Sequence, residues 1–120
     1  KNRAIQTKLE KVISYTKQTM VAYMSEEDLN RLCAYIVEYS SGDTLQKISP
    51  VKVDSQLKSV DIMHFGWNIG KAFSKKRIHT ATFIKNVFAH ALRDIEISTI
   101  ERKMSHAEAK CEINLDSKIA

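Results

Sequence analysis

Apolar residues recur at three- and four-residue steps along most of the chain, a spacing that places them on one face of an α-helix. The first pattern predicts a helix from about residue 3 to residue 23, with lysines on its other face. A second helix should begin at Ser25, whose hydroxyl can cap it, with Asp28 in the first turn, and should end near residues 40–42. The two apolar stripes are Ile5, Leu9, Val12, Ile13, Thr16, Met20 and Met24, followed by Leu29, Leu32, Cys33, Ile36 and Val37.

A long connection is predicted at residues 41–55. This stretch holds one of the three glycines and the only proline, Pro50, which rules out a continuous helix. A third helix can begin at Asp54 or Ser55. Its apolar residues cover nearly all of its circumference, which is typical of a helix in the middle of a bundle. They are Leu57, Val60, Met63 and Trp67 on one side and Ile62, Phe65, Ile69 and Phe73 on the other.

Two more helices are predicted in the second half of the chain. Thr80 can cap the fourth, which carries the clearest amphipathic stripe, and the capping-box spacing of Ser98 and Glu101 predicts a short fifth helix from 99 to about 109. The final CEINLDSKIA alternates apolar and polar residues, which suits either a short extended edge or a loose tail. We therefore expect an all-α protein, a compact bundle of four to five helices. The stripe of the fourth helix is Phe83, Ile84, Val87, Phe88, Ala91, Leu92 and Ile95.

Length and composition favour one soluble domain over the whole chain, 1–120. With 120 residues, 43% hydrophobic and 28% charged, the chain can bury a single core. Its apolar runs are too short to span a membrane, and charges interleave the first residues, so we expect a cytoplasmic protein without a signal peptide or membrane partner. Because the chain does not begin with Met, it could also be a fragment of a longer one. Cys33 and Cys111 fit neither a zinc site nor a disulfide framework, and Cys33 suits a buried thiol.

No enzyme motif is complete in this sequence. None of the four histidines stands in HExxH, and His90 with Asp94 at i, i+4 is more typical of a surface hydrogen bond than of catalysis. HEPN-type ribonucleases need Arg, four to six residues and then His, whereas Arg102 and His106 enclose only three. A serine nucleophile elbow is absent as well. We expect a non-enzymatic protein with no cofactor and no metal.

Gly66, Gly70 and Lys71 resemble part of a phosphate-binding loop but do not complete it. The glycines enclose three residues instead of four, and Ala72 stands where a Ser or Thr should follow the lysine. On a helix, glycines at i and i+4 form a shallow notch that another backbone can approach closely. The notch could serve close packing within the monomer or an interface with a second subunit.

The most basic part of the chain is the best candidate for a binding site. The net charge is +5, and residues 55–93 hold seven bases against one acid. A basic turn before the fourth helix suits phosphate oxygens, since the first amides of that helix add their own attraction. The bland alternative, a solvated turn that keeps the protein soluble, is equally open. The candidate residues are Lys71, Lys75, Lys76, Arg77, His79, Thr80 and Lys85.

The sequence offers two other arrangements of bases. Lysines of the first helix, among them Lys8, Lys11 and Lys17, would add a second strip of phosphate contacts if that helix folds onto the same side. A helix-turn-helix at residues 81–109 would present Arg102, Lys103, His106 and Lys110 to a groove, but Glu101, Glu108 and Glu112 in the same element would repel the phosphates.

The segment KKRIHTATFIKNVFAHAL resembles the C-terminal region of RteC-type regulators of conjugative transposons. A basic cluster there precedes a Thr-bearing helix start, an aromatic-aliphatic pair and an amphipathic helix, as Lys75, Lys76, Arg77, Thr80 and the pair at 83–84 do here. The preceding VDIMHFGWNIGKAF is similar to small helical proteins of bacterial mobile elements. The resemblance implies a bacterial origin and an accessory or regulatory role linked to DNA.

The sequence therefore indicates two alternative functions. The first is a module that binds DNA or RNA through its exposed basic turn. The alternative is a protein-interaction or homodimerisation module, in which the notch at Gly66 and Gly70 and the long first helix meet a second copy or a partner protein.

Overall fold

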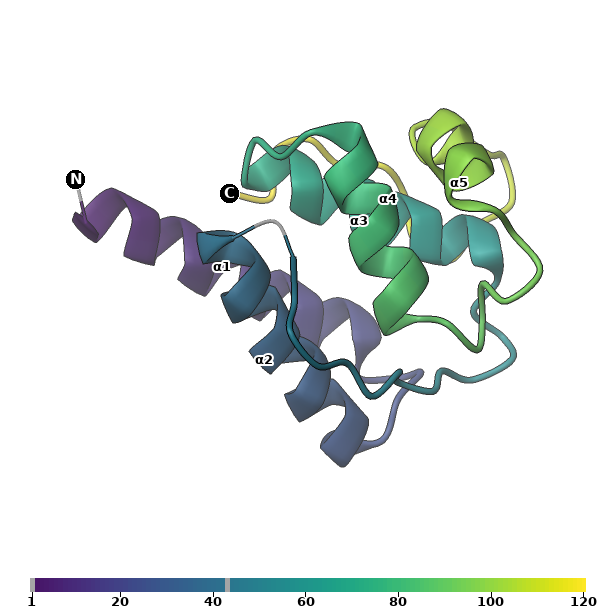
Figure 1. Ribbon diagram of the computed structural model, residues 1–120, viewed down its shortest axis with the longest axis horizontal. Helices are drawn as coiled ribbons and strands as arrows, with labels where there is room; N and C mark the ends of the chain where they lie inside the picture. Colours follow the sequence, from purple (N-terminus) through teal and green to yellow (C-terminus); the bar gives the residue numbers. More distant parts are fainter. Residues whose placement is uncertain (1, 43) are drawn as a thin grey trace.

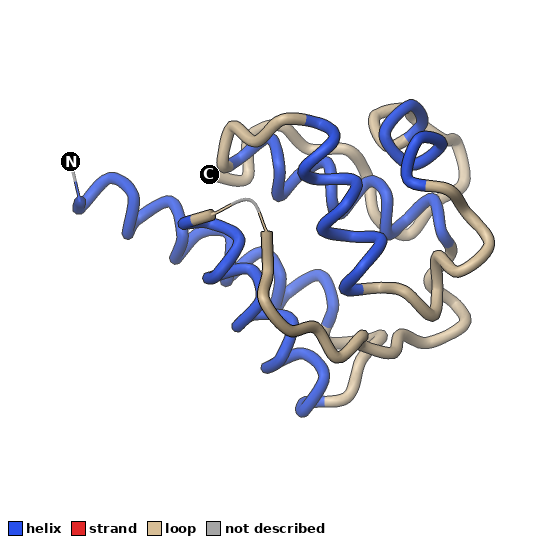
Figure 2. The backbone as a smooth tube through the Cα atoms, viewed as in Figure 1, coloured by secondary structure: helices blue, strands red, loops and turns tan. Residues whose placement is uncertain are grey.

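The helical prediction is confirmed by the structure, a computed structural model that describes residues 2–42 and 44–120 (Figure 1). Over these ranges the secondary structure consists of helices and loops and contains no strand (Figure 2). None of the described helices is long and apolar enough to cross a membrane. The helices are α1 (Asn2–Met20), α2 (Glu26–Ser41), α3 (Ser59–Ala72), α4 (Arg77–Val87) and α5 (Ile97–Lys103).

Helices α1 and α2 form an antiparallel pair, and α3, α4 and α5 gather beside it (Figure 1). Val12, Thr16 and Met20 of α1 are fully buried, as their spacing predicts. The predicted cap of α2 is also confirmed, because the Ser25 hydroxyl accepts a hydrogen bond from the Asp28 amide at 3.1 Å. Residues 3–8 of α1 are all exposed, and in Figure 1 the first turns of this helix project past the end of α2.

The second half of the long connection between α2 and α3 is held to α2 by hydrogen bonds. Arg31 of α2 donates to the carbonyl oxygens of Ser49 at 3.0 Å and Pro50 at 2.9 Å. The Asp28 carboxylate, which also pairs with Arg31 at 3.1 Å, accepts a bond from the Lys52 amide. These bonds fix the connection to α2, and residues 51–58 then cross to the start of α3 (Figure 1).

Helix α3 begins four or five residues later than predicted. The Asp54 carboxylate accepts from the Gln56 amide at 2.8 Å and its carbonyl accepts from the Leu57 amide at 3.0 Å, which makes a turn. Lys58 is extended and forms the N-cap, and its amide donates to the Asp61 carboxylate at 2.9 Å. The local turn made by Asp54 therefore competes with helix formation at the predicted start.

Helix α4 also begins away from its predicted cap. Its N-cap is Lys76, and Thr80 lies inside the helix, where its side chain is buried. The Thr80 hydroxyl lies 2.8 Å from the Tyr39 hydroxyl and 3.3 Å from the Lys76 carbonyl. The assignment of Thr80 as a cap is wrong, because a threonine within a helix can bond to the carbonyl four residues earlier and face the core.

The end of the predicted fourth helix and the start of the fifth also differ from expectation. Helix α4 ends at Val87, and residues 88–94 form turns that still bury Phe88 and Leu92. Glu96, with extended backbone angles, is the N-cap of α5, so the predicted capping box of Ser98 and Glu101 is wrong. Apolar spacing at three and four residues is satisfied by successive turns as well as by one continuous helix.

The segment after α5 is neither an extended edge nor a loose tail. Its backbone is bound by three buried polar side chains of α3, namely Asp61, His64 and Asn68. The Asp61 carboxylate accepts from the amides of Glu112 at 2.6 Å and Ile113 at 3.1 Å. We call these three side chains the polar stripe, since their spacing of three and four residues places them on one side of α3.

His64 and Asn68 complete the attachment of this C-terminal segment. The two ring nitrogens of His64 lie 2.7 Å from the carbonyl oxygens of Ile113 and His106. Asn68 donates to the Asn114 carbonyl at 2.9 Å and accepts from the Asp116 amide at 2.6 Å. Irregular backbone can thus lie against the core without leaving buried polar groups unpaired.

Candidate nucleic-acid interface

The predicted basic turn is a tight reversal between α3 and α4. The Lys75 amide donates to the Gly70 carbonyl at 2.8 Å, and Ser74 adopts a left-handed φ of 55°, a backbone conformation that commonly follows a helix end. Lys71 at the end of α3 and Lys76 on the turn are exposed, and their ammonium groups make no hydrogen bond or ion pair with any residue that the structure describes. These two lysines are therefore open to a solution partner.

The other charged candidates bind to the protein's own backbone. The Lys75 ammonium donates to the Gly42 carbonyl at 3.1 Å and lies 5.0 Å from the centre of the Tyr39 ring. Arg77 donates to the Ser105 hydroxyl at 3.0 Å and to the Glu101 carbonyl, which joins the start of α4 to the end of α5. Both side chains stabilise contacts between distant segments, so their charge is only partly available to phosphate.

Lys85 has the most extensive structural role of the candidate bases. Its half-buried ammonium group donates to the carbonyl oxygens of Leu92 at 2.7 Å, Arg93 at 3.4 Å and Ile95 at 2.6 Å. These carbonyls belong to the turns that follow α4, outside the hydrogen bonds of that helix, and the Leu92 carbonyl also accepts from the Ile95 amide at 3.1 Å. Lys85 therefore closes the α4–α5 connection and does not face the basic turn as an open charge.

Replacing Lys85 by methionine tests this structural assignment. We expect the free energy of unfolding to fall by about 1–2 kcal/mol, because three carbonyl oxygens lose a charged donor while the apolar stem is kept. The measurement is urea denaturation followed by circular dichroism. Lys76→Met serves as the matched control, since its exposed ammonium makes no bond with the described residues, and its stability should stay within about 0.5 kcal/mol of the unsubstituted protein.

The two uncharged candidates are less accessible than the sequence suggested. Thr80 is 2% exposed and its hydroxyl is bonded to Tyr39, so it faces the core. His79 is half-buried at the start of α4. Of the seven predicted residues, Lys71 and Lys76 are the two lysines that are exposed and whose ammonium groups make no bond with the described residues.

The notch formed by Gly66 and Gly70 is filled by α4 of the same chain. A Cβ atom at Gly66 would lie 2.5 Å from Cγ2 of Ile84, and one at Gly70 would overlap the hydroxyl of Thr80. Both glycines are buried, so the close-packing alternative describes their place in the fold. The notch is not open to a second subunit.

Two lysines of α1, Lys8 and Lys11, extend toward the end of the bundle that carries Lys71, whereas Lys17 lines a groove between α1 and α2. Tyr15 of α1 accepts a hydrogen bond from Asn68 of α3 at 2.8 Å, and the two helices run in opposite directions (Figure 1). Lys8 and Lys11 precede Tyr15 by seven and four residues and so share its side of α1. Because the two helices are antiparallel, the start of α1 lies at the same end of the bundle as the end of α3. Lys8 and Lys11 therefore extend toward the end that carries Lys71.

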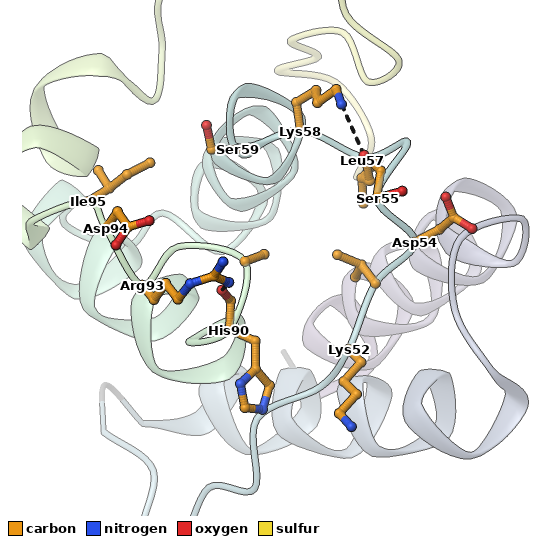
Figure 3. A pocket seen from close by; sticks show the side chains of 12 residues that line it. Lys52, Asp54, Ser55, Leu57, Lys58, Ser59, His90, Arg93, Asp94 and Ile95 are labelled. Atoms are coloured by element: carbon orange, nitrogen blue, oxygen red, sulfur yellow. Dashed lines mark hydrogen bonds between the residues drawn. The ribbon is translucent and has the colours of Figure 1, made fainter.

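A cleft lies elsewhere, between the end of the long connection and the turns after α4 (Figure 3). It has a volume of about 570 Å³, and its charged lining is mixed, with Lys52, Asp54 and Asp94 among the contributors. His90 and Asp94 both line it, but no hydrogen bond joins them in the part of the chain that the structure describes. Arg93 donates to the His90 carbonyl at 2.8 Å.

Burial affects the titration of two further groups, one in α1 and one in α2. Burial raises the pKa of the Cys33 thiol, and the opposing attraction of Lys17 is the smaller effect. Burial likewise raises the pKa of the Tyr15 hydroxyl, although its bond from Asn68 acts in the other direction. Both groups therefore stay protonated at neutral pH. Within residues 2–42 and 44–120, no cluster of three His, Cys, Asp or Glu side chains is placed to hold a metal.

Comparisons with protein-family models, curated proteins and solved structures find no match to this chain. The class defined by the fold is that of all-α helical bundle proteins. The resemblance to RteC-type regulators stays a hypothesis, and the assignment of function depends on the geometry of the surface.

Proposed function

We propose that the protein is a non-enzymatic helical module that binds nucleic acid through four lysines at one end of the bundle. The supporting observation is that Lys8 and Lys11 of α1 extend toward the end of α3 that carries Lys71, with Lys76 following on the basic turn. All four side chains are exposed. We call these four residues the lysine group.

Phosphate is the ligand chemistry that this surface favours. Lysine ammonium groups act as mobile point charges that contact phosphate oxygens without demanding a fixed geometry. Such contacts carry little sequence information, because sequence is read at base edges and these short-range contacts reach only the backbone. The proposed binding is therefore governed by charge and salt, and the internal contacts of Arg77 and Lys85 support the surface by holding α4 and α5 in place.

The resemblance of residues 75–92 to RteC-type regulators supports DNA as the nucleic acid and an accessory or regulatory role in a bacterial mobile element. A duplex offers phosphates on both sides of each groove, so an exposed strip on α1 and a separate turn after α3 can contact two stretches of backbone together. RNA is retained in the test because a backbone contact does not by itself distinguish the two polymers.

Removal of the lysine group should weaken binding and lower its salt dependence. The variant carries Lys8→Gln, Lys11→Gln, Lys71→Gln and Lys76→Gln, and fluorescence anisotropy with labelled duplex DNA, single-stranded DNA and RNA measures affinity over a salt series. The slope of log affinity against log salt should fall by about 3–4 for duplex DNA, since each lost phosphate contact releases about 0.9 fewer counterions. Affinity at low salt should fall by at least about tenfold.

The control removes the same charge from another part of the surface. It replaces Lys52, Arg102, Lys103 and Lys110 by glutamine, all of them exposed. Three of these belong to the helix-turn-helix alternative, so the control also tests that arrangement. Loss of binding in the control with retention in the lysine-group variant would refute the proposal, and so would the absence of salt-sensitive binding by the unsubstituted protein at low ionic strength.

A further inference from the structure

A shallow groove between α1 and α2 leaves apolar side chains uncovered. It has a volume of about 460 Å³, and Leu9, Ile13 and Val37 contribute to its lining. Val37 is 46% exposed, and Leu9 and Ile13 are only partly buried. The groove therefore offers apolar surface that a packed partner would remove from water.

One acidic and one basic residue of α1 line this groove. Glu10 and Lys17 both line it and stand seven residues apart on α1, which places them two helical turns from one another on the same side. Ser14, a small residue, lies between them. Glu10 is exposed and makes no hydrogen bond or ion pair with the residues that the structure describes, so its charge has no partner within the described chain.

We propose that the occupant of this groove is a second copy of the same chain, packed with its α1 antiparallel to the first. With the twofold axis between Ile13 and Ser14, Glu10 of one copy faces the partner's Lys17, and Lys17 faces the partner's Glu10. A twofold interface requires each contact to occur twice, and one acid and one base placed symmetrically about the axis meet that requirement. A small residue beside the axis lets the two helices approach closely.

The same register covers a further exposed apolar residue. Val21, which follows α1 and is 65% exposed, stands opposite the partner's Gln6 in this arrangement. The Val21 amide donates to the Lys17 carbonyl at 3.1 Å, so it continues the helical path of α1. The interface thus joins apolar contacts of Leu9, Ile13 and Val21 to two reciprocal ion pairs.

Charge exchange tests the proposal directly by sedimentation velocity over a concentration series. Glu10→Lys or Lys17→Glu alone places like charges opposite each other, and each should weaken dimerisation by at least about tenfold. The double variant, Glu10→Lys with Lys17→Glu, restores both pairs in reverse and should return the dissociation constant to within about threefold of the unsubstituted value. Lys8→Glu, on another side of α1, controls for a general effect of charge and should leave dimerisation unchanged.

A cross-link checks the position of the axis. Ser14→Cys, made with Cys33→Ala and Cys111→Ala, should form a disulfide-linked dimer on mild oxidation, because a residue beside the axis meets its own copy. Gln18→Cys in the same background should run as a monomer on a non-reducing denaturing gel after the same oxidation. An unsubstituted protein that is monomeric at millimolar concentration overturns the proposal, as does a double variant that dimerises no better than the single ones.

Discussion

Replacing Asp61 by alanine is expected to lower the free energy of unfolding by about 3–5 kcal/mol. The carboxylate is 1% exposed and accepts hydrogen bonds from three backbone amides, those of Lys58, Glu112 and Ile113. Its loss removes the cap of α3 and leaves two amides of the C-terminal segment without their buried acceptor. The measurement is the urea midpoint and slope from circular dichroism and tryptophan fluorescence.

The control for this variant is Asp94→Ala, because Asp94 is exposed on the cleft and makes no hydrogen bond with the described residues. Its stability should change by no more than about 0.5 kcal/mol. Asp61→Asn keeps the size of the side chain but removes its charge. One of its two carboxylate oxygens is replaced by an NH2 group, a donor that faces a backbone amide. If Asp61→Ala is as stable as the control, the polar stripe does not hold the C-terminal segment.

Gly70→Ala is expected to destabilise the protein by at least about 2 kcal/mol, although alanine favours a helix over glycine by about 1 kcal/mol. The added Cβ would overlap the Thr80 hydroxyl and lie 2.9 Å from its methyl carbon. Thr80 is β-branched and held in α4, so it cannot turn away freely and the two helices must separate. Thermal and urea denaturation give the loss.

Two further variants isolate the contact between Gly70 and Thr80. Thr80→Ala removes the overlapping atoms, so the combined variant should be less destabilised than the two single effects added together. Gly42→Ala is the matched control, because a Cβ there has no neighbour within 4 Å and the backbone is extended with φ at −160°. A loss at Gly42→Ala equal to that at Gly70→Ala would contradict the close-packing explanation.

The helical architecture follows from apolar spacing because burial of one face is what stabilises a helix in a bundle. Residues such as Val12, Leu32 and Ile69 are buried as their periodicity predicts. The helix boundaries are less predictable. The side chains of Asp54 and Thr80 can each cap a helix or form another local hydrogen bond, and tertiary contacts decide which of these occurs. The start of α2 at Ser25 was predictable because cap and acidic first turn agree.

The polar stripe could have been predicted from the sequence, but from the spacing of its polar residues and not from that of the apolar ones. Asp61, His64 and Asn68 recur at helical spacing on an otherwise apolar helix, which indicates that one side of it meets polar groups. Only the fold shows that these groups are the backbone of residues 106–116. The basic turn was equally incomplete as a prediction, because whether Lys75 and Lys85 bind carbonyls or water depends on distant segments.

The polar stripe also bears on the order in which the chain folds. Its hydrogen bonds to the C-terminal segment join residues 42 to 52 positions apart, whereas α3, α4 and α5 follow one another with short connections. Because distant pairs lose more chain entropy on closing, we expect the local helices to assemble first and the segment to dock afterwards. Contacts that form after the rate-limiting step of folding affect the unfolding rate more than the folding rate. We therefore expect docking of the C-terminal segment mainly to slow unfolding.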